Sequence, residues 1–404
     1  MSSRHASAAV AASPAAARIP DAMAFYLLAS ITVTFLAGSS APTPLYPVYQ
    51  AEWGFSAMTV TFIFGIYAIA VLAALLVAGR LSDHIGRRPV LIGAALVQAA
   101  TMLLFATAGG VGELVAARVI QGLSTGAAVT AVGAGLLDLD KARGTTANAL
   151  APPIGTALGG VLAGTMVRFL PEPTHLVYLL LALVFVAQAI GVARIAEPGV
   201  LRAGALRSLK PQLGVPPAAR GPLALAVPAL VASWALGGFY VALAPMLVRD
   251  ITGTSGSLLG GLAVFVLAGS AGTAIALLGK LGPRGLMASG ALAVVAGVAL
   301  VLIALGQHSL PVFFAATALA GVGFGSAFQG AVRTVAATTA AHDRAGALSV
   351  VFIVSYLSMG VPAVCAGYLV ARHGDIAGTA REFGAVVIAL ALAALAGVLV
   401  QRKR

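Results

Sequence analysis

The sequence predicts an all-α polytopic membrane protein with twelve transmembrane helices in two six-helix halves. Its 404 residues are 60% hydrophobic and only 9% charged, whereas soluble domains are about 45–50% apolar and about 25% charged. Its apolar runs repeatedly exceed the roughly 18 residues that cross a bilayer. No run shows the period-2 alternation of a barrel strand, and the bilayer core cannot satisfy free backbone groups, so each span should be helical.

Polar breaks between the apolar runs define the spans and their grouping. An N-terminal six-helix bundle is expected over 22–194 and a C-terminal one over 222–404, joined by a proline-containing cytoplasmic linker over 195–221. The twelve spans are expected at 22–46, 57–79, 89–108, 111–136, 145–168, 175–194, 222–247, 257–279, 285–306, 310–332, 345–371 and 382–400.

Residues 1–21 are predicted to be a cytoplasmic tail, because a signal peptide has a short apolar core of roughly 7–15 residues and a cleavage site. The distribution of Lys and Arg gives the orientation. With the N-terminus inside, Arg118 lies within a span, and 19 of the other 23 basic residues lie inside. The four outside are Arg168, Arg249, Arg372 and Arg381. We therefore expect an inner (plasma) membrane protein with both termini cytoplasmic.

Short matches between the halves recur at a nearly constant spacing. Residues 79–81 (Gly-Arg-Leu) end the second span, and 279–281 (Gly-Lys-Leu) end the eighth, 200 residues later. Residues 41–45 resemble 242–246, and residues 140–144 loosely resemble 342–346. Together these matches indicate a duplicated six-helix unit.

The loop over 79–89 is unusually polar, because five of its eleven residues are ionisable. Gly79 permits close helix approach, and Gly86 permits a turn with positive φ. Asp83 can accept hydrogen bonds from the N-terminus of a neighbouring helix, and Arg87 and Arg88 can pair with carboxylates. The alternative is a loop that only sets membrane orientation.

Span four contains Arg118, followed by Gln121 and Gly122. An Arg at the bilayer centre costs roughly 2.5–3.5 kcal/mol on insertion scales, so it usually faces a cavity or a partner. The alternative is that Arg118 extends to the nearby membrane surface.

These patterns resemble the major facilitator superfamily (MFS) of transporters over nearly the whole chain. Gly79, Asp83, Gly86, Arg87 and Arg88 match the family's loop motif between helices two and three, Gly-x-Leu-x-Asp-x-x-Gly-Arg-Arg/Lys. The resemblance implies the MFS fold. It also implies that this loop is a conformational latch, which holds the outward-open state against the start of helix eleven near residue 344.

Two further patterns resemble the drug/proton antiporter branch of this family. Arg118, Gln121 and Gly122 are similar to its helix-four motif Arg-x-x-Gln-Gly, which implies a role in proton coupling or recognition of substrate charge. Span five resembles its Gly-Pro-x-x-Gly-Gly motif, although Pro152 replaces the first Gly and Gly155 falls one position early. Plain helix packing is an equally good interpretation of this motif, whose residues are Pro153, Gly155, Gly159 and Gly160.

In such a fold, spans one, four, seven and ten should line the central cavity. Their candidate residues are mostly aromatic, which suits an apolar or amphipathic solute better than a sugar. They are Tyr26, Phe35, Ser39, Tyr46, Gln121, Trp234, Phe239, Tyr240, Phe324, Phe328 and Gln329. Each aromatic residue could equally pack against lipid or another helix. No acidic residue is expected at mid-membrane, so proton coupling would have to use Glu113, Asp21 or Asp83.

Several functions lack the residues they need. The basic residues are scattered over loops rather than gathered on one surface, which argues against nucleic acid. Cys365 lies in an apolar run and is expected to pack there, with no second cysteine for a disulfide. A phosphate-binding loop, a histidine cluster and paired carboxylates are all missing, which argues against ATP use, a metal, a cofactor and enzymatic catalysis.

The predicted function is secondary transport of a small organic solute by alternating access. We expect efflux of an apolar or amphipathic compound, with proton coupling left open, by a monomer in the lipid bilayer. An uncoupled or uptake-type metabolite transporter is one alternative. A non-transporting membrane receptor or assembly factor on the same fold is another.

Overall fold

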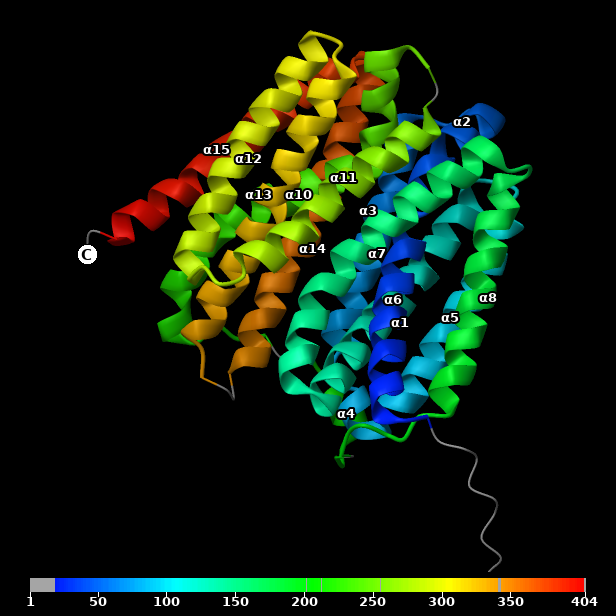
Figure 1. Ribbon diagram of the computed structural model, residues 1–404, viewed down its shortest axis with the longest axis vertical. Coiled ribbons are helices and arrows are strands. Elements are labelled where there is room, and N and C mark those ends of the chain that lie inside the picture. Colours follow the sequence, from blue (N-terminus) through cyan, green and yellow to red (C-terminus); the bar gives the residue numbers. More distant parts are fainter. Residues whose placement is uncertain (1–18, 201, 212, 255, 341–342, 403–404) are drawn as a thin grey trace, which may run out of the picture.

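The computed structural model describes residues 19–402, apart from 201, 212, 255 and 341–342, and it is a bundle of long helices (Figure 1). Most of the predicted tail over 1–21 therefore lies outside the described residues. Within the described part, twelve helical segments are long and apolar enough to cross a membrane. The predicted fold class is confirmed.

The first half contains α1 to α8. Its first span is not one continuous helix, because prolines interrupt it. Pro42 and Pro44 divide the segment that the sequence predicts as one helix over 22–46. The elements are α1 (Asp21–Ser40), η1 (Thr43–Leu45), α2 (Tyr46–Trp53), α3 (Ala57–Ala78), α4 (Ser82–Ile85), α5 (Arg87–Ala106), α6 (Val111–Leu139), α7 (Lys141–Phe169) and α8 (Pro173–Ala193).

The second half follows a linker that contains the short helix α9 (Ala205–Ser208). Its helices, apart from α11, extend beyond the predicted spans, because hydropathy marks the apolar part of a helix and not its polar ends. They are α10 (Pro217–Thr252), α11 (Ser257–Leu278), α12 (Pro283–Gly306), α13 (Leu310–Ala337), α14 (Arg344–His373) and α15 (Ile376–Arg402).

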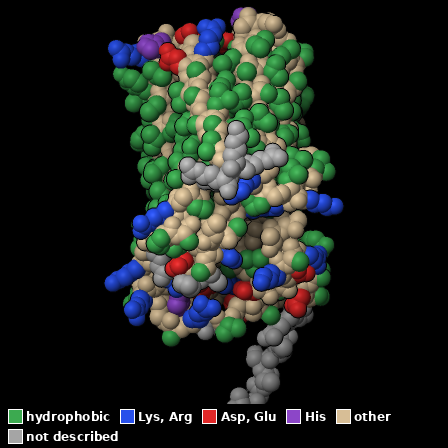
Figure 2. Space-filling model, turned by 90° about the vertical axis from the view of Figure 1, so that its left-hand side faces the viewer, with side chains coloured by type: hydrophobic (Ala, Val, Ile, Leu, Met, Phe, Trp, Pro, Cys, Tyr) green, Lys and Arg blue, Asp and Glu red, His purple; other side chains and the backbone are tan. Residues whose placement is uncertain are grey.

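Hydrophobic side chains cover the middle of the molecule, and charged side chains gather towards its ends (Figure 2). Buried apolar residues form separate cores, one drawn from residues 24–195 and two from residues 226–398 together with Phe64. Cys365 is exposed, contrary to its expected packing role, because it lies on the outward face of α14. An apolar side chain on that face suits contact with lipid.

The two halves approach most closely at the end that carries residues 41–56 and 170–172, here called the far end. Glycines permit this approach: a Cβ on Gly160 of α7 would lie 3.1 Å from the carbonyl oxygen of Gly261 of α11. A Cβ on Gly367 of α14 would lie 2.8 Å from the Cβ of Thr61 on α3. Small residues of this kind let helix backbones pack directly against one another.

At the opposite end, called the linker end, the halves are separated by a crevice. This end carries α4, α9 and the described residues between 194 and 216. Gly79 and Arg80 face Ala345 and Ser349 of α14 across a space of about 160 Å³, which Lys210 of the linker also lines. The halves are therefore in close contact at the far end and apart at the linker end.

Candidate functional site

A central cavity of about 220 Å³ lies between the halves. In the described part of the chain its lining comes from the long helices α1, α3, α7, α10, α11, α13 and α14. The expected contribution from span four is wrong, because none of the lining residues comes from α6. Spans two, five, eight and eleven contribute as well as spans one, seven and ten, since these helices lie at the contact between the halves.

Aromatic rings form one wall of the cavity, centred on Trp234 of α10. The ring centroid of Trp234 lies 5.2 Å from that of Phe328, 6.5 Å from that of Phe324 and 5.0 Å from that of Tyr356. Such edge-to-face and tilted arrangements stabilise aromatic clusters beyond the burial of their area. Tyr67 of α3 belongs to the lining on the side of the first half.

The polar groups of the lining are few and uncharged. No lining residue in the described part of the chain is charged at neutral pH. The polar residues of the lining are Ser39, Ser40, Asn148, Thr156 and Gln329, together with Tyr67 and Tyr356. The Ser39 hydroxyl donates to the Leu36 carbonyl 2.7 Å away, so its donor is already used.

The structure places the sequence-predicted cavity residues in two groups. Trp234, Phe328 and Gln329 line the cavity, as do Ser39 and Phe324. The other predicted residues do not line the cavity, and Tyr46, Gln121 and Phe239 are among them.

Tyr26, Phe35 and Tyr240 do not line the cavity. Tyr26 is 64% exposed and accepts a hydrogen bond from Arg143 at 3.0 Å. Phe35 is buried against Phe185, with centroids 4.9 Å apart, and Tyr240 shares a 2.9 Å hydrogen bond with Thr317. Each of these three side chains lies on a face of its helix that does not meet the other half.

Arg118 is fully buried within the first half, so it does not extend to the membrane surface. Its Nε and Nη2 donate to the Tyr46 hydroxyl at 3.2 and 2.7 Å, and its Nη1 donates to the Ser39 carbonyl at 2.9 Å and to Gln121 Oε1 at 2.7 Å. Its guanidinium carbon also lies 5.2 Å from the Tyr67 ring centroid. Neutral acceptors and rings thus stabilise this buried charge, in a geometry that Arg favours.

The network around Arg118 borders the cavity without entering it. Ser39 and Tyr67 line the cavity on one side and contact Arg118 on the other. Gln121 Nε2 donates to the Gly38 carbonyl at 3.0 Å, which fixes α6 against α1. Gly122 packs against α3, where a Cβ would lie 2.7 Å from the Tyr67 carbonyl oxygen.

The helix-five motif packs α7 against two partners. Gly155 and Gly159 face α1, where added Cβ atoms would lie 2.9 Å from Leu36 Cβ and 2.6 Å from the Ala37 carbonyl carbon. Gly160 faces α11 of the other half, while Pro153 lines the cavity. These contacts account for the small residues by packing, and they place part of this packing at the contact between the halves.

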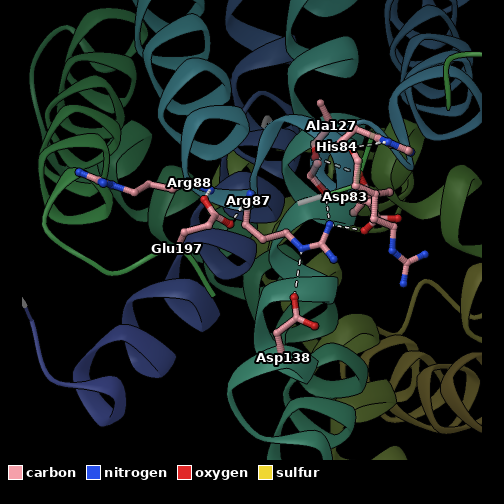
Figure 3. A network of polar contacts seen from close by, with 10 residues as sticks. Asp83, His84, Arg87, Arg88, Ala127, Asp138 and Glu197 are labelled. Carbon is pink, nitrogen blue, oxygen red and sulfur yellow. Dashed lines mark hydrogen bonds and ion pairs between the residues drawn. The ribbon is translucent and has the colours of Figure 1, made fainter. Parts of the chain in front are cut away.

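The loop between α3 and α5 folds around Arg87, as Figure 3 shows. Arg87 Nη1 pairs with Asp83 and donates to Ser82 Oγ at 2.7 Å, while Nε pairs with Asp138 of α6 at 3.2 Å. Gly86 has a φ of 106°, a conformation that favours glycine. The loop is thus held to its own half, between α3, α5 and α6.

Glu197 of the linker holds the start of α5, a contact that the sequence did not reveal. Its two carboxylate oxygens accept from the backbone N–H groups of Arg87 at 2.7 Å and Arg88 at 3.0 Å. A carboxylate is favourable at a helix N-terminus, where free N–H groups and the helix dipole meet. Arg88 in turn donates to the carbonyls of Val192 and Ala193 at the end of α8.

The predicted latch partner is not engaged in this conformation. Asp83 contacts Arg87, and its carbonyl accepts from the Arg202 backbone N–H at 3.0 Å. Among the described residues, no hydrogen bond or ion pair joins the loop to α14. The crevice described above lies between them.

The acids considered for proton coupling all lie off the cavity. Glu113 accepts from the Gly109 N–H at the start of α6, and Asp21 is in the exposed first turn of α1. Asp83 belongs to the loop network at the linker end.

Across the residues that the structure describes, twelve candidate spans in two facing halves, with a largely apolar cavity between them, define a polytopic membrane protein of the transporter class. Residues 28–299 match the sequence profile of the Major Facilitator Superfamily, and the chain belongs to this family. No curated protein matches the sequence significantly.

Solved structures share the fold at low sequence identity. A mutant form of the nucleoside transporter NupG aligns with a TM-score of 0.73 at 11% identity, covering 94% of this chain and 100% of that one. A bacterial homolog of the human lysosomal transporter Spinster, in an inward-facing and occupied conformation, aligns with a TM-score of 0.65 at 13% identity, covering 94% of each chain. Its inward-facing and unoccupied form aligns with a TM-score of 0.68 at 12% identity, with the same coverage.

Proposed function

We propose that this protein moves an uncharged, apolar or amphipathic organic solute across the membrane by alternating access, in the direction of efflux. The observation that carries the proposal is the central cavity, which combines an aromatic wall around Trp234 with a few neutral polar groups. A lining of this kind suits ring-containing solutes that need few hydrogen bonds.

The predicted orientation supports the proposed direction of efflux. If the positive-inside rule holds, the linker end faces the cytoplasm, and the two halves are apart at that end. Closure at the far end and separation at the linker end support a cavity loaded from the cytoplasm, as efflux requires.

The cavity supports transport without a proton carrier of its own. Arg118 is held by neutral acceptors, and the carboxylates of Glu113, Asp21 and Asp83 lie elsewhere. Antiport driven by protons would therefore need a group remote from the solute, and we propose it only as an alternative to uncoupled transport.

Uptake of a neutral metabolite is the second candidate function. The fold likeness to a structure titled as a nucleoside transporter favours it, and so do the Asn148 and Gln329 amides in the cavity. A receptor or assembly factor that does not transport is a third hypothesis, and it predicts no protein-dependent flux.

Counterflow in proteoliposomes tests the proposal. Vesicles loaded with unlabelled chloramphenicol, an uncharged aromatic amide, should accumulate labelled chloramphenicol faster than protein-free vesicles, and Trp234→Ala should reduce that rate several-fold. An imposed pH gradient should leave the rate unchanged, whereas a gradient-dependent rate would favour antiport. Counterflow of labelled uridine but not chloramphenicol would favour the uptake candidate.

A further inference from the structure

Two carboxamide side chains face the cavity from opposite halves. Asn148 lies on α7 and Gln329 on α13. Asn148 Nδ2 donates to the Gly133 carbonyl at 2.9 Å, and within the described part of the chain no donor engages its Oδ1. Among the described residues, no hydrogen bond engages the Gln329 amide. Both groups can therefore meet a bound molecule.

The two amides lie at a similar depth, nearer the linker end than the centre of the aromatic wall. Asn148 is seven residues from the start of α7, and Gln329 is eight residues from the end of α13. At 1.5 Å per residue, these positions are about 10 and 12 Å along their helices, whereas Phe324, on the same helix as Gln329, is about 20 Å from the end of α13. Gln329 directly follows Phe328, whose ring centroid lies 5.2 Å from that of Trp234. A bound molecule would thus meet the amides beside the rings, at the edge of the ring cluster that is nearer the linker end.

The charge around the cavity is positive and uncompensated. Among the described residues, the lining has no side chain that is charged at neutral pH, and the guanidinium of Arg118 lies directly behind Ser39 and Tyr67. In the described part of the chain both ion pairs involve Arg87, so no carboxylate pairs with Arg118. An organic cation would lose its hydration beside a positive charge and gain no counter-ion.

From these observations, and resting on the proposed function, we infer that the cavity selects uncharged planar ring compounds with a hydrogen-bond donor and an acceptor on one edge. A lactam or ring amide has this chemistry, because a carboxamide can both donate to it and accept from it. The ring packs against Trp234, Phe324 and Phe328, the polar edge meets Asn148 and Gln329, and organic cations are rejected.

Three probes of matched size separate these features. 2-Quinolone is a neutral lactam, quinoline at pH 8 is a neutral ring without the N–H and C=O pair, and N-methylquinolinium is a cation. The chain has two tryptophans, so in a Trp53→Phe background the quenching of Trp234 fluorescence reports binding in the cavity. We expect 2-quinolone to bind about tenfold tighter than quinoline, as one net hydrogen bond allows, and N-methylquinolinium to bind weakest.

Variants of Gln329 test whether its side-chain amide causes the selectivity. Gln329→Leu should weaken 2-quinolone binding about three- to tenfold and leave quinoline within twofold, while the matched control Gln307→Leu, on the exposed end of α12, should change neither. Gln329→Glu keeps the side-chain shape and should raise affinity for N-methylquinolinium. The inference is overturned if 2-quinolone and quinoline bind equally, or if Gln329→Leu weakens both to the same extent.

The binding and counterflow experiments distinguish a failure of the inferred ligand selectivity from a failure of the proposed transport function. Lactam selectivity without any counterflow would remove the transport function and keep the ligand class. Counterflow of chloramphenicol together with equal binding of 2-quinolone and quinoline would keep the transporter and remove the selectivity that we assign to the amides.

Discussion

Replacing Gly261 with Val should open the far end of the molecule. A Cβ at this position would lie 3.0 Å from the carbonyl carbon of Gly160 and closer still to its oxygen, with Pro44 Cγ 3.2 Å away. Ordinary contacts begin near 3.4 Å, so the backbones of α7 and α11 must separate. Overpacking of this kind costs about 1–3 kcal/mol. The cost falls only on the state in which the far end is closed, so the opposite state should gain about 5- to 150-fold in relative population.

Thiol labelling measures this shift. Thr43 is fully buried at the far end, where its hydroxyl donates to the Val241 carbonyl across the halves at 2.7 Å. With Cys365→Ser removing the native thiol, Thr43→Cys should react with a membrane-impermeant maleimide about 5- to 150-fold faster when Gly261→Val is present. Gly269→Val is the matched control, because a Cβ at Gly269 on the same helix meets no atom within 4 Å. Equal labelling rates in a folded Gly261→Val protein, or the same increase in the control, would refute the reasoning.

Three further predictions concern the buried arginine and the charged loop. Arg118→Ala leaves the buried oxygens of Tyr46, Ser39 and Gln121 without their donor. It should destabilise the protein by about 1–3 kcal/mol, the cost of an unsatisfied buried polar group, seen as a fall in thermal midpoint. Arg118→Lys should lose less, and equal midpoints for Ala and wild type would contradict the network. Glu197→Gln removes the charge at the start of α5 and should cost about 0.5–2 kcal/mol, with faster proteolysis of the linker as the readout; unchanged cleavage would argue against this contact. Asp83→Asn removes the charge of one of the two carboxylates paired with Arg87 in the described part of the chain, and it should change maleimide labelling of a cysteine in the crevice at the linker end; identical labelling would limit Asp83 to membrane orientation.

Hydropathy was sufficient for the helices, because a span needs only a long apolar run. It was less informative at their ends, where polar turns continue α10 and α15 beyond the apolar part, and in the first span, where prolines break the helix. The polarity of the 79–89 loop likewise marked a real charged network around Arg87.

Hydropathy could not identify which residues line the cavity. Phe35 and Phe328 are both aromatic residues in apolar helices, yet one packs against Phe185 and the other lines the cavity. The difference depends on which helix face meets the other half, and a uniformly apolar helix has no periodicity to mark that face. Asn148 did carry a signal, since it is the only asparagine of the sequence and lies in a span.

The Glu197 contact illustrates a second limit. It joins the linker to Arg87 across 110 positions of sequence, and a carboxylate in a polar linker has no pattern that names its partner. For Arg118 the cost of burial did predict a partner, but Tyr46 became that partner only because the chain turns at Pro42 and Pro44.

The most direct test of the account asks whether one cavity opens to both sides of the membrane in turn. Phe328→Cys places a thiol on the cavity wall, and Cys365→Ser removes the native one. Thr61→Cys with Gly367→Cys adds a reversible disulfide across the far end, because the two Cβ positions are 2.8 Å apart and a small relaxation reaches the usual separation of about 3.5–4.5 Å. The measurement is maleimide labelling of residue 328 from each side, before and after oxidation.

Alternating access predicts labelling from both sides in the reduced protein. Oxidation should abolish labelling from the far end, preserve it from the linker end, and be reversed by reductant. Labelling from one side only in the reduced protein, or labelling from the far end that survives the disulfide, would contradict the account.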